Sequence, residues 1–129
     1  MARAAGTFDV KLTQQSTDAE DSGTTLGRYA LEKQFRGDLD ATSKGEMLSA
    51  GTQTKGSAGY VAQERVTGTL AGRSGSFVLQ HTGVMNRGAP GLTITVVPDS
   101  GTGALAGITG TMNIIIEAGK HSYELDYDL

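Results

Sequence analysis

Apolar and polar side chains alternate along most of the chain, in short segments separated by glycine-rich breaks. In residues 6–13, for example, Phe8, Val10 and Leu12 share one face, and polar residues fill the positions between them. A period of two is typical of β-strands, and no helical period of 3.6 competes with it. The pattern predicts eight strands, at about residues 6–13, 26–36, 38–50, 59–70, 74–85, 91–98, 105–117 and 120–128.

Most of the predicted connections are short, which favours strands that follow one another as neighbours. The exception is residues 14–25, a polar and acidic segment that we interpret as a loop, either solvated or acting as a lid over a cavity. A meander that closes on itself leaves no unpaired strand edge. We therefore expect an all-β fold, with one antiparallel eight-stranded barrel domain over residues 1–129.

The hairpin near residue 72 determines where a lone histidine points. A two-residue loop of type II′ at Gly72 and Arg73 would place Glu64 directly opposite His81. Another loop length would shift His81 by two residues but keep it on the same face. Because that face is the apolar one, we expect both side chains to point inward. The same face also carries Tyr60, Val66, Phe77, Leu79 and Met85.

The last two predicted strands form a second hairpin, with Ala118 and Gly119 as its loop. One face of this hairpin is apolar and also carries His121, Tyr123 and Tyr127, whereas the reverse face carries the acidic residues near the C-terminus. We interpret the acidic face as solvated and the other as interior. Several inward positions are small, and they either leave room for a ligand or let the strands bend. These small positions are Ala62, Gly68, Gly83 and Gly110.

Composition narrows the classes of function. With 14 acidic and 11 basic residues and no basic run, the chain offers no surface for nucleic acid. No apolar run approaches the roughly 18 residues of a membrane span, and the start has no signal-like segment, so we expect a cytoplasmic protein. Cysteine is absent, which excludes disulfides and thiolate chemistry. His81 and His121 lie on different hairpins without other ligands nearby, so we expect no metal and no cofactor.

Three segments carry a resemblance to a known family. They are ERVTGTLAGRSGSFVLQHTG (residues 64–83), VVPDSGTGALAGITGT (residues 96–111) and the ending HSYELDYDL, and they closely resemble an uncharacterised bacterial family, a domain of unknown function. The resemblance spans most of the chain after Gly37. It implies an allene-oxide-cyclase-like, calycin-like barrel of eight antiparallel strands, without an established activity. Ala104 departs from the family pattern, in which an acidic residue often follows the Gly-Thr-Gly loop.

Relatives of that barrel include plant allene oxide cyclases and bacterial natural-product cyclases, which shape a reactive apolar molecule inside the cavity. Our first hypothesis is therefore a small-molecule-binding barrel, either an isomerase or a cyclase, with Glu64 and His81 as its acid and base. An inward tyrosine would donate a hydrogen bond to an oxyanion. The candidate ligand-binding residues are Tyr60, Phe77, Met85, Tyr123, Tyr127 and Glu46. A bulge near Gly45 would decide which way Glu46 points.

The alternative hypothesis is a filled barrel that acts as a structural or interaction module. In this case Glu64 and His81 form a buried pair that fixes the strand register. We expect such a barrel to be a homo-oligomer, without nucleic-acid or membrane partners. The volume inside the barrel beside His81 separates the two hypotheses.

Overall fold

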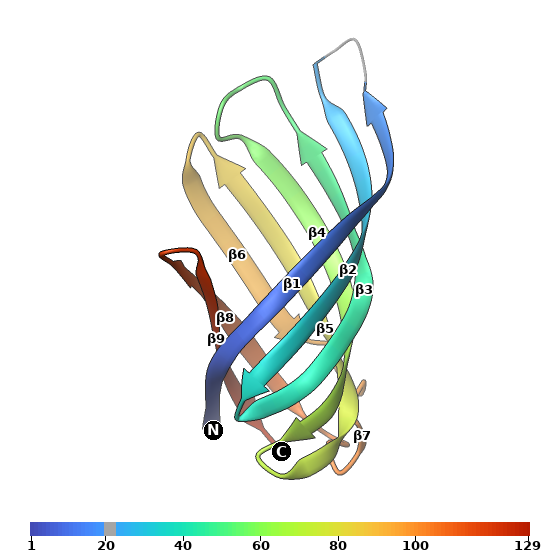
Figure 1. Cartoon of the computed structure of the whole chain (residues 1–129), viewed down its shortest axis with the longest axis vertical. Coiled ribbons are helices and arrows are strands. Elements are labelled where there is room, and N and C mark those ends of the chain that lie inside the picture. Colours follow the sequence, from blue (N-terminus) through green and yellow to red (C-terminus); the bar gives the residue numbers. More distant parts are fainter. Residues whose placement is uncertain (20–22) are drawn as a thin grey trace.

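The computed structural model describes residues 1–19 and 23–129, and their regular structure consists of β-strands (Figure 1). These strands are β1 (Ala2–Ala19), β2 (Thr25–Gly37), β3 (Leu39–Gly51), β4 (Ala58–Leu70), β5 (Arg73–Asn86), β6 (Ala89–Val96), β7 (Thr102–Gly103), β8 (Thr109–Glu117) and β9 (Lys120–Asp128). Because no helix occurs in the described ranges, none is long and apolar enough to cross a membrane. The predicted all-β class is confirmed.

Eight long strands form a closed antiparallel barrel. Strands β1 to β6 pair consecutively, β6 pairs with β8, β8 with β9, and β9 with β1, which closes the sheet. The two-residue strand β7 adds to the end of β5. Closure satisfies the backbone groups that an open edge would expose. The predicted eight-stranded barrel is thus confirmed, with one short extra strand.

Several predicted element boundaries were wrong, and β1 already begins at Ala2 rather than at residue 6. β1 continues to Ala19 and β2 begins at Thr25, so most of the expected loop at residues 14–25 is paired strand. Its polar side chains suit a two-stranded hairpin that extends beyond the packed core. Residues 20–22, and with them the suggested lid, lie outside the described residues. Strand β8 begins at Thr109 rather than near residue 105, because Leu105 and Ile108 belong to turns packed into the barrel end.

The β4–β5 hairpin turns one residue earlier than we expected. Its loop is Ala71 and Gly72, with φ values of 49° and 83°, which is the left-handed geometry that type I′ turns require at both positions. The prediction placed glycine first because alanine is disfavoured there. His81 consequently lies opposite Ala62 rather than Glu64. The shift is two residues, so the inward orientation of both side chains is confirmed.

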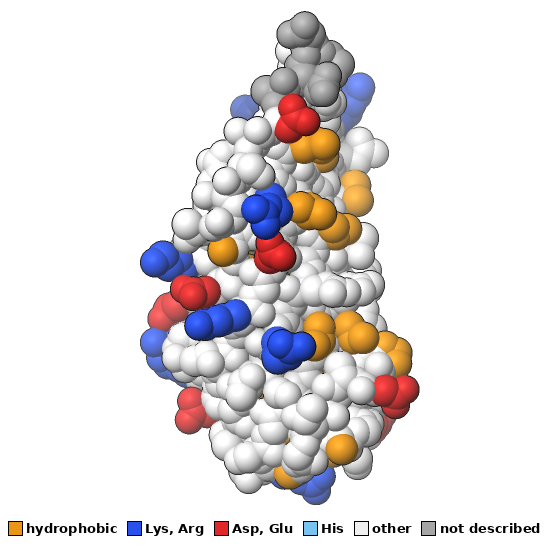
Figure 2. All heavy atoms as spheres, turned by 90° about the vertical axis from the view of Figure 1, so that its right-hand side faces the viewer, with side chains coloured by type: hydrophobic (Ala, Val, Ile, Leu, Met, Phe, Trp, Pro, Cys, Tyr) orange, Lys and Arg blue, Asp and Glu red, His pale blue; other side chains and the backbone are white. Residues whose placement is uncertain are grey.

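The β8–β9 hairpin has the predicted loop at Ala118 and Gly119 and the predicted register. It places Tyr123 and Tyr127 on the inner face. The side of the barrel that faces right in Figure 1 carries interspersed acidic, basic and apolar side chains, as Figure 2 shows. This side of the exterior is therefore mixed in character, whereas the interior is divided into a packed end and a hollow end.

A dense apolar core fills the end of the barrel that lies lower in Figure 1. Phe35 and Tyr123 pack edge to face with ring centroids 5.5 Å apart. The chain between β6 and β8 folds across this end and buries Leu105 and Ile108. The remaining fully buried apolar side chains include Leu39, Val66, Leu70, Phe77, Leu79, Ile94 and Leu125. This core closes one end of the barrel.

Tyr123 also joins the β2–β3 turn to the core through its hydroxyl group. Its Oη accepts a hydrogen bond from Leu39 N at 2.9 Å and donates to Arg36 O at 2.9 Å. Tyr123→Phe leaves the buried Leu39 N–H unpaired, so we expect the free energy of unfolding to fall by about 1–3 kcal/mol. Urea denaturation measures this loss.

Tyr127→Phe is the matched control for that substitution. Tyr127 lies on the same face of β9, and its hydroxyl makes no hydrogen bond to any described residue. We expect it to change stability by less than about 0.5 kcal/mol. Equal losses for the two variants would contradict the role assigned to the Tyr123 hydroxyl.

Candidate functional site

The end of the barrel opposite the core encloses a cavity of about 680 Å³. Inward side chains at its mouth remain accessible, since Leu92 is 45% and Ile116 is 63% exposed. Its walls are mainly apolar and include Val10, Leu12, Leu31, Met47, Met85 and Ile114. The volume lies in the range typical of small-molecule sites. The barrel is therefore not filled by its own side chains.

Four small inward residues were predicted either to leave room for a ligand or to let the strands bend, and two of them line the cavity. Ala62 and Gly83 line it, whereas Gly68 and Gly110 lie where a Cβ atom would collide with the backbone of the neighbouring strand. A Cβ atom at Gly83 would overlap the ring of Tyr60. Glycine at this position therefore lets the Tyr60 ring lie across β5.

A buried polar cluster lies beneath the cavity, with one residue from each of four consecutive strands. Glu64 on β4 is at its centre, and its Oε2 accepts from Lys33 Nζ on β2 at 2.8 Å. The same oxygen is 2.6 Å from His81 Nε2 on β5. The other oxygen, Oε1, accepts from Ser43 Oγ on β3 at 2.7 Å. Exposure is 7% for Lys33, 1% for Glu64 and 2% for His81, so the cluster is almost dry.

The charges of this cluster compensate one another. Burial alone would raise the pKa of the Glu64 carboxyl, but hydrogen bonds from His81 and Lys33 and the positive charge of Lys33 hold that pKa at about 2. Glu64 is therefore ionised at neutral pH. The Lys33 ammonium group also lies 5.0 Å from the ring centroid of Phe8 and 5.7 Å from that of Phe35, where cation–π attraction assists it.

The imidazole of His81 has one engaged nitrogen and one that faces the phenol of Tyr60. Because Glu64 is ionised, His81 Nε2 carries a proton and donates a hydrogen bond to Glu64 Oε2. In the neutral ring Nδ1 is then an acceptor, and Tyr60 Oη lies 3.3 Å from it. Burial and the nearby Glu64 charge raise the pKa of Tyr60, so the phenol keeps its proton. A hydrogen-bond acceptor and a donor thus meet at the cavity wall.

The other predicted ligand-binding residues lie in three different places. Met85 is at the cavity mouth, whereas Phe77, Tyr123 and Tyr127 pack around the core at the opposite end. Glu46 points outward and pairs with Arg28, with a 2.8 Å separation between oxygen and nitrogen. The structure therefore brings only Tyr60 and Met85 to the cavity with His81.

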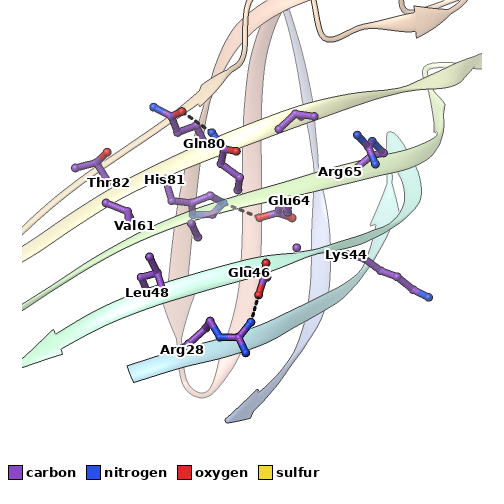
Figure 3. Close-up of a pocket in the computed structure, with 14 residues that line it drawn as sticks. Arg28, Lys44, Glu46, Leu48, Val61, Glu64, Arg65, Gln80, His81 and Thr82 are labelled. Atoms are coloured by element: carbon purple, nitrogen blue, oxygen red, sulfur yellow. Dashed lines mark hydrogen bonds and ion pairs between the residues drawn. The ribbon is translucent and has the colours of Figure 1, made fainter. Parts of the chain in front are cut away.

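Figure 3 shows a second hollow, of about 720 Å³, on the outer side of β2 to β5. Its lining includes the exposed Arg28–Glu46 pair and also reaches the buried residues Glu64 and His81. No bulge occurs in β3 near Gly45, because its register with β2 and β4 is continuous. This places Met47 inside and leaves Glu46 and Leu48 outside. The inner cavity, with its buried polar floor, is the better candidate site.

Sequence reasoning missed Lys33 and Ser43. The signal for Lys33 is present in the sequence, because it falls on the same face of the second strand as Tyr29, Leu31 and Phe35, at a period of two. Ser43 lies directly opposite Lys33, but only the register between β2 and β3 reveals this. His121, which we expected on the inner face but did not predict as a ligand-binding residue, lines the cavity and lies against the Phe8 ring.

The polar atoms of the cluster form hydrogen bonds with one another. Every buried side-chain nitrogen and oxygen in the described residues has a hydrogen-bond partner. In the same residues, no three His, Asp or Glu side chains converge in a way that would hold a metal ion. The described residues place hydrogen-bond donors and acceptors and one ammonium group, that of Lys33, at the wall and floor of the cavity.

Comparison with known proteins places the chain among relatives of unknown activity. No curated protein matches it. A crystal structure of a protein with unknown function from the DUF3224 family of Shewanella oneidensis MR-1 is similar, with a TM-score of 0.97 and 54% sequence identity. That match covers 100% of this chain and 97% of the other. The family described as "Protein of unknown function (DUF3224)" matches residues 4–127. The chain belongs to this DUF3224 family.

Proposed function

We propose that the protein binds one small, largely apolar molecule in the barrel cavity. The main support for this proposal is the apolar cavity of about 680 Å³, which has Lys33, Tyr60 and His81 in its lining. Apolar walls would supply most of the binding free energy, and the few polar groups would fix the orientation of the bound molecule. Exposed inward side chains at the mouth give the ligand a path from solvent.

We further propose that the protein carries out acid–base chemistry on the bound molecule. Glu64 holds the proton of His81 on Nε2, which leaves Nδ1 to take a proton from a bound molecule. Lys33 offers positive charge, and Tyr60 a hydrogen bond, to an oxygen that becomes negative. These roles suit an isomerisation or a cyclisation, in which a proton is moved without a second substrate.

Binding is tested with N-phenyl-1-naphthylamine, a neutral apolar dye that fluoresces in a dry site. Met47→Trp places a larger side chain in the cavity, whereas Leu48→Trp, its neighbour on β3, places the same side chain outside. We expect wild type and Leu48→Trp to bind one dye per chain with similar affinity. Met47→Trp should bind at least about tenfold more weakly, equivalent to about 1.4 kcal/mol.

The control decides between interior and exterior binding. A dye affinity that falls with Leu48→Trp but not with Met47→Trp would place the dye on the outer face. Absence of dye binding to wild type would contradict the proposed function. Circular dichroism of the three proteins checks that each retains its strands.

A second candidate function is an interaction module that associates with its own copies. One observation favours it: four apolar side chains on the outside of β2 to β5 are about half exposed, namely Leu26, Leu48, Val61 and Val84. Leu48 and Val61 lie directly opposite each other across β3 and β4. Sedimentation of wild type and Leu48→Lys would reveal such association as a loss of dimer in the variant.

A further inference from the structure

The ionisable side chains that line the cavity are all basic or phenolic. Lys33, His81 and His121 line it together with Tyr60, and no aspartate or glutamate among the described residues does so. The nearest carboxylate, Glu64, is beneath the lining, and both of its oxygens are already bonded to Lys33, His81 and Ser43. The polar part of the cavity is therefore built for a group that accepts hydrogen bonds and carries negative charge.

Lys33 and His81 retain hydrogen-bonding capacity after they have bonded Glu64. An ammonium group has three N–H donors, and the hydrogen bond from Lys33 Nζ goes to a single carboxylate oxygen, with two aromatic rings nearby. His81 Nδ1 faces only Tyr60 Oη, at the long separation of 3.3 Å. An entering carboxyl group that brings a proton can therefore donate to His81 Nδ1 and accept from Lys33 Nζ.

The charges beside the cavity determine under which conditions an anion can bind there. Lys33 and Glu64 already neutralise each other, so a bare carboxylate would add an uncompensated charge to a nearly dry site, at a high cost. An imidazole can take up a proton near neutral pH and cancel that charge. Glu64 and Tyr60 from β4 contact His81, and Lys33 from β2 binds the same Glu64 oxygen, while Ile94 lies opposite His81 on β6. His121 on β9 is the other titratable group of the lining.

We propose that the ligand is an apolar weak acid, of the carboxylic acid class, which binds together with one proton. The proton is shared between the carboxyl group and His81 Nδ1, so that the ligand anion and the imidazolium form an ion pair inside the cavity. Tyr60 donates a hydrogen bond to the same carboxyl group, and Lys33 adds positive charge. No covalent bond forms or breaks. This inference rests on the proposed function and defines the class of molecule that the cavity takes.

The test uses three probes of one length and different head groups: decanoate, decanamide and decylammonium. Each displaces N-phenyl-1-naphthylamine from the wild-type protein at pH 7.5. We expect decanoate to bind at least about tenfold more tightly than decanamide, and decylammonium to bind most weakly. Because the amide has nearly the same shape as the carboxylate, the comparison isolates charge and proton uptake.

Calorimetry of decanoate binding at pH 8 then counts protons, in phosphate and in Tris, whose ionisation enthalpies differ. We expect uptake of about one proton per decanoate, and an affinity that falls as the pH rises. Equal binding of decanoate and decanamide, preference for decylammonium, or binding without proton uptake would each overturn this inference. If the dye binds but no decyl probe displaces it, the inference also fails and the proposed function stands. If the dye does not bind, both fail.

Discussion

Replacing Glu64 with glutamine lowers the free energy of unfolding by about 3–5 kcal/mol, because Lys33 is left buried without a counter-ion. Glutamine has nearly the shape of glutamate, so the effect comes from the lost charge rather than from a void. The Glu64 carboxylate binds Lys33, His81 and Ser43 at 2.6 to 2.8 Å, so three partners lose a charged acceptor together. Urea denaturation at pH 7 measures the loss.

Two controls define what this loss means. Glu46→Gln breaks the Arg28–Glu46 pair on the barrel exterior, where both side chains are at least half exposed, and we expect a change below about 1 kcal/mol. The double variant Lys33→Met, Glu64→Leu removes both buried charges, and we expect it to lose less stability than Glu64→Gln alone. If Glu64→Gln costs no more than Glu46→Gln, the buried charge cluster does not exist as described.

Acid weakens the fold through the same carboxylate. In the folded protein the pKa of Glu64 is about 2, whereas its ordinary value is 4.5. The unfolded chain therefore binds a proton at higher pH than the folded chain does. The stabilisation, of about 3 kcal/mol, is fully present above pH 4.5 and is lost as the pH falls towards 2. Urea denaturation at a series of pH values from 7 to 2.5 measures this decline.

The double variant Lys33→Met, Glu64→Leu is the reference for the acid experiment. Other carboxylates also titrate in this range, and the pKa of Asp126 is lowered by its hydrogen bond to Arg3 on the surface. These groups remain in the double variant, so the difference between the two proteins isolates the cluster. We expect the stability of the double variant to fall by clearly less than that of wild type. Parallel declines would show that Glu64 is not ionised and buried in the folded protein.

Alternation along the strands was enough to predict the barrel and the inward orientation of Glu64 and His81. A side chain's face depends only on parity, which a two-residue shift preserves. The exact partner of His81 depended on the turn, and Ala71 adopts a φ value of 49° that alanine usually avoids. The face of β5 that carries His81 was therefore predicted correctly, but the residue opposite it on β4 was not.

The central place of Glu64 in the site could not be predicted from one hairpin. Lys33 and Ser43 reach it from β2 and β3, and only barrel closure with a continuous register brings the four strands together. The predicted ligand-binding roles of Tyr123 and Tyr127 had assumed that every inward tyrosine faces the same space. The division of the interior into a packed end and a hollow end, which separates them from Tyr60, depends on packing over the whole molecule.

The proposed binding function accounts for the costly buried charges of the interior. A barrel that served only as a scaffold would be at least as stable with apolar residues in place of Lys33 and Glu64. In a binding site the same charges orient His81 and leave its Nδ1 towards the cavity. We therefore propose that the cluster is kept for its role towards the cavity.

The most direct measurement is a crystal structure of the protein with 10-bromodecanoate or 10-bromodecanamide, in which anomalous scattering locates the bromine atom. We expect one bromine peak per chain inside the cavity, near the mouth residues Leu92 and Ile116. We also expect density for the head group within hydrogen-bond distance of His81 Nδ1 or Tyr60 Oη. Bromine peaks confined to the outer face of the barrel, with neither compound in the cavity at saturating concentration, would contradict ligand binding inside the barrel.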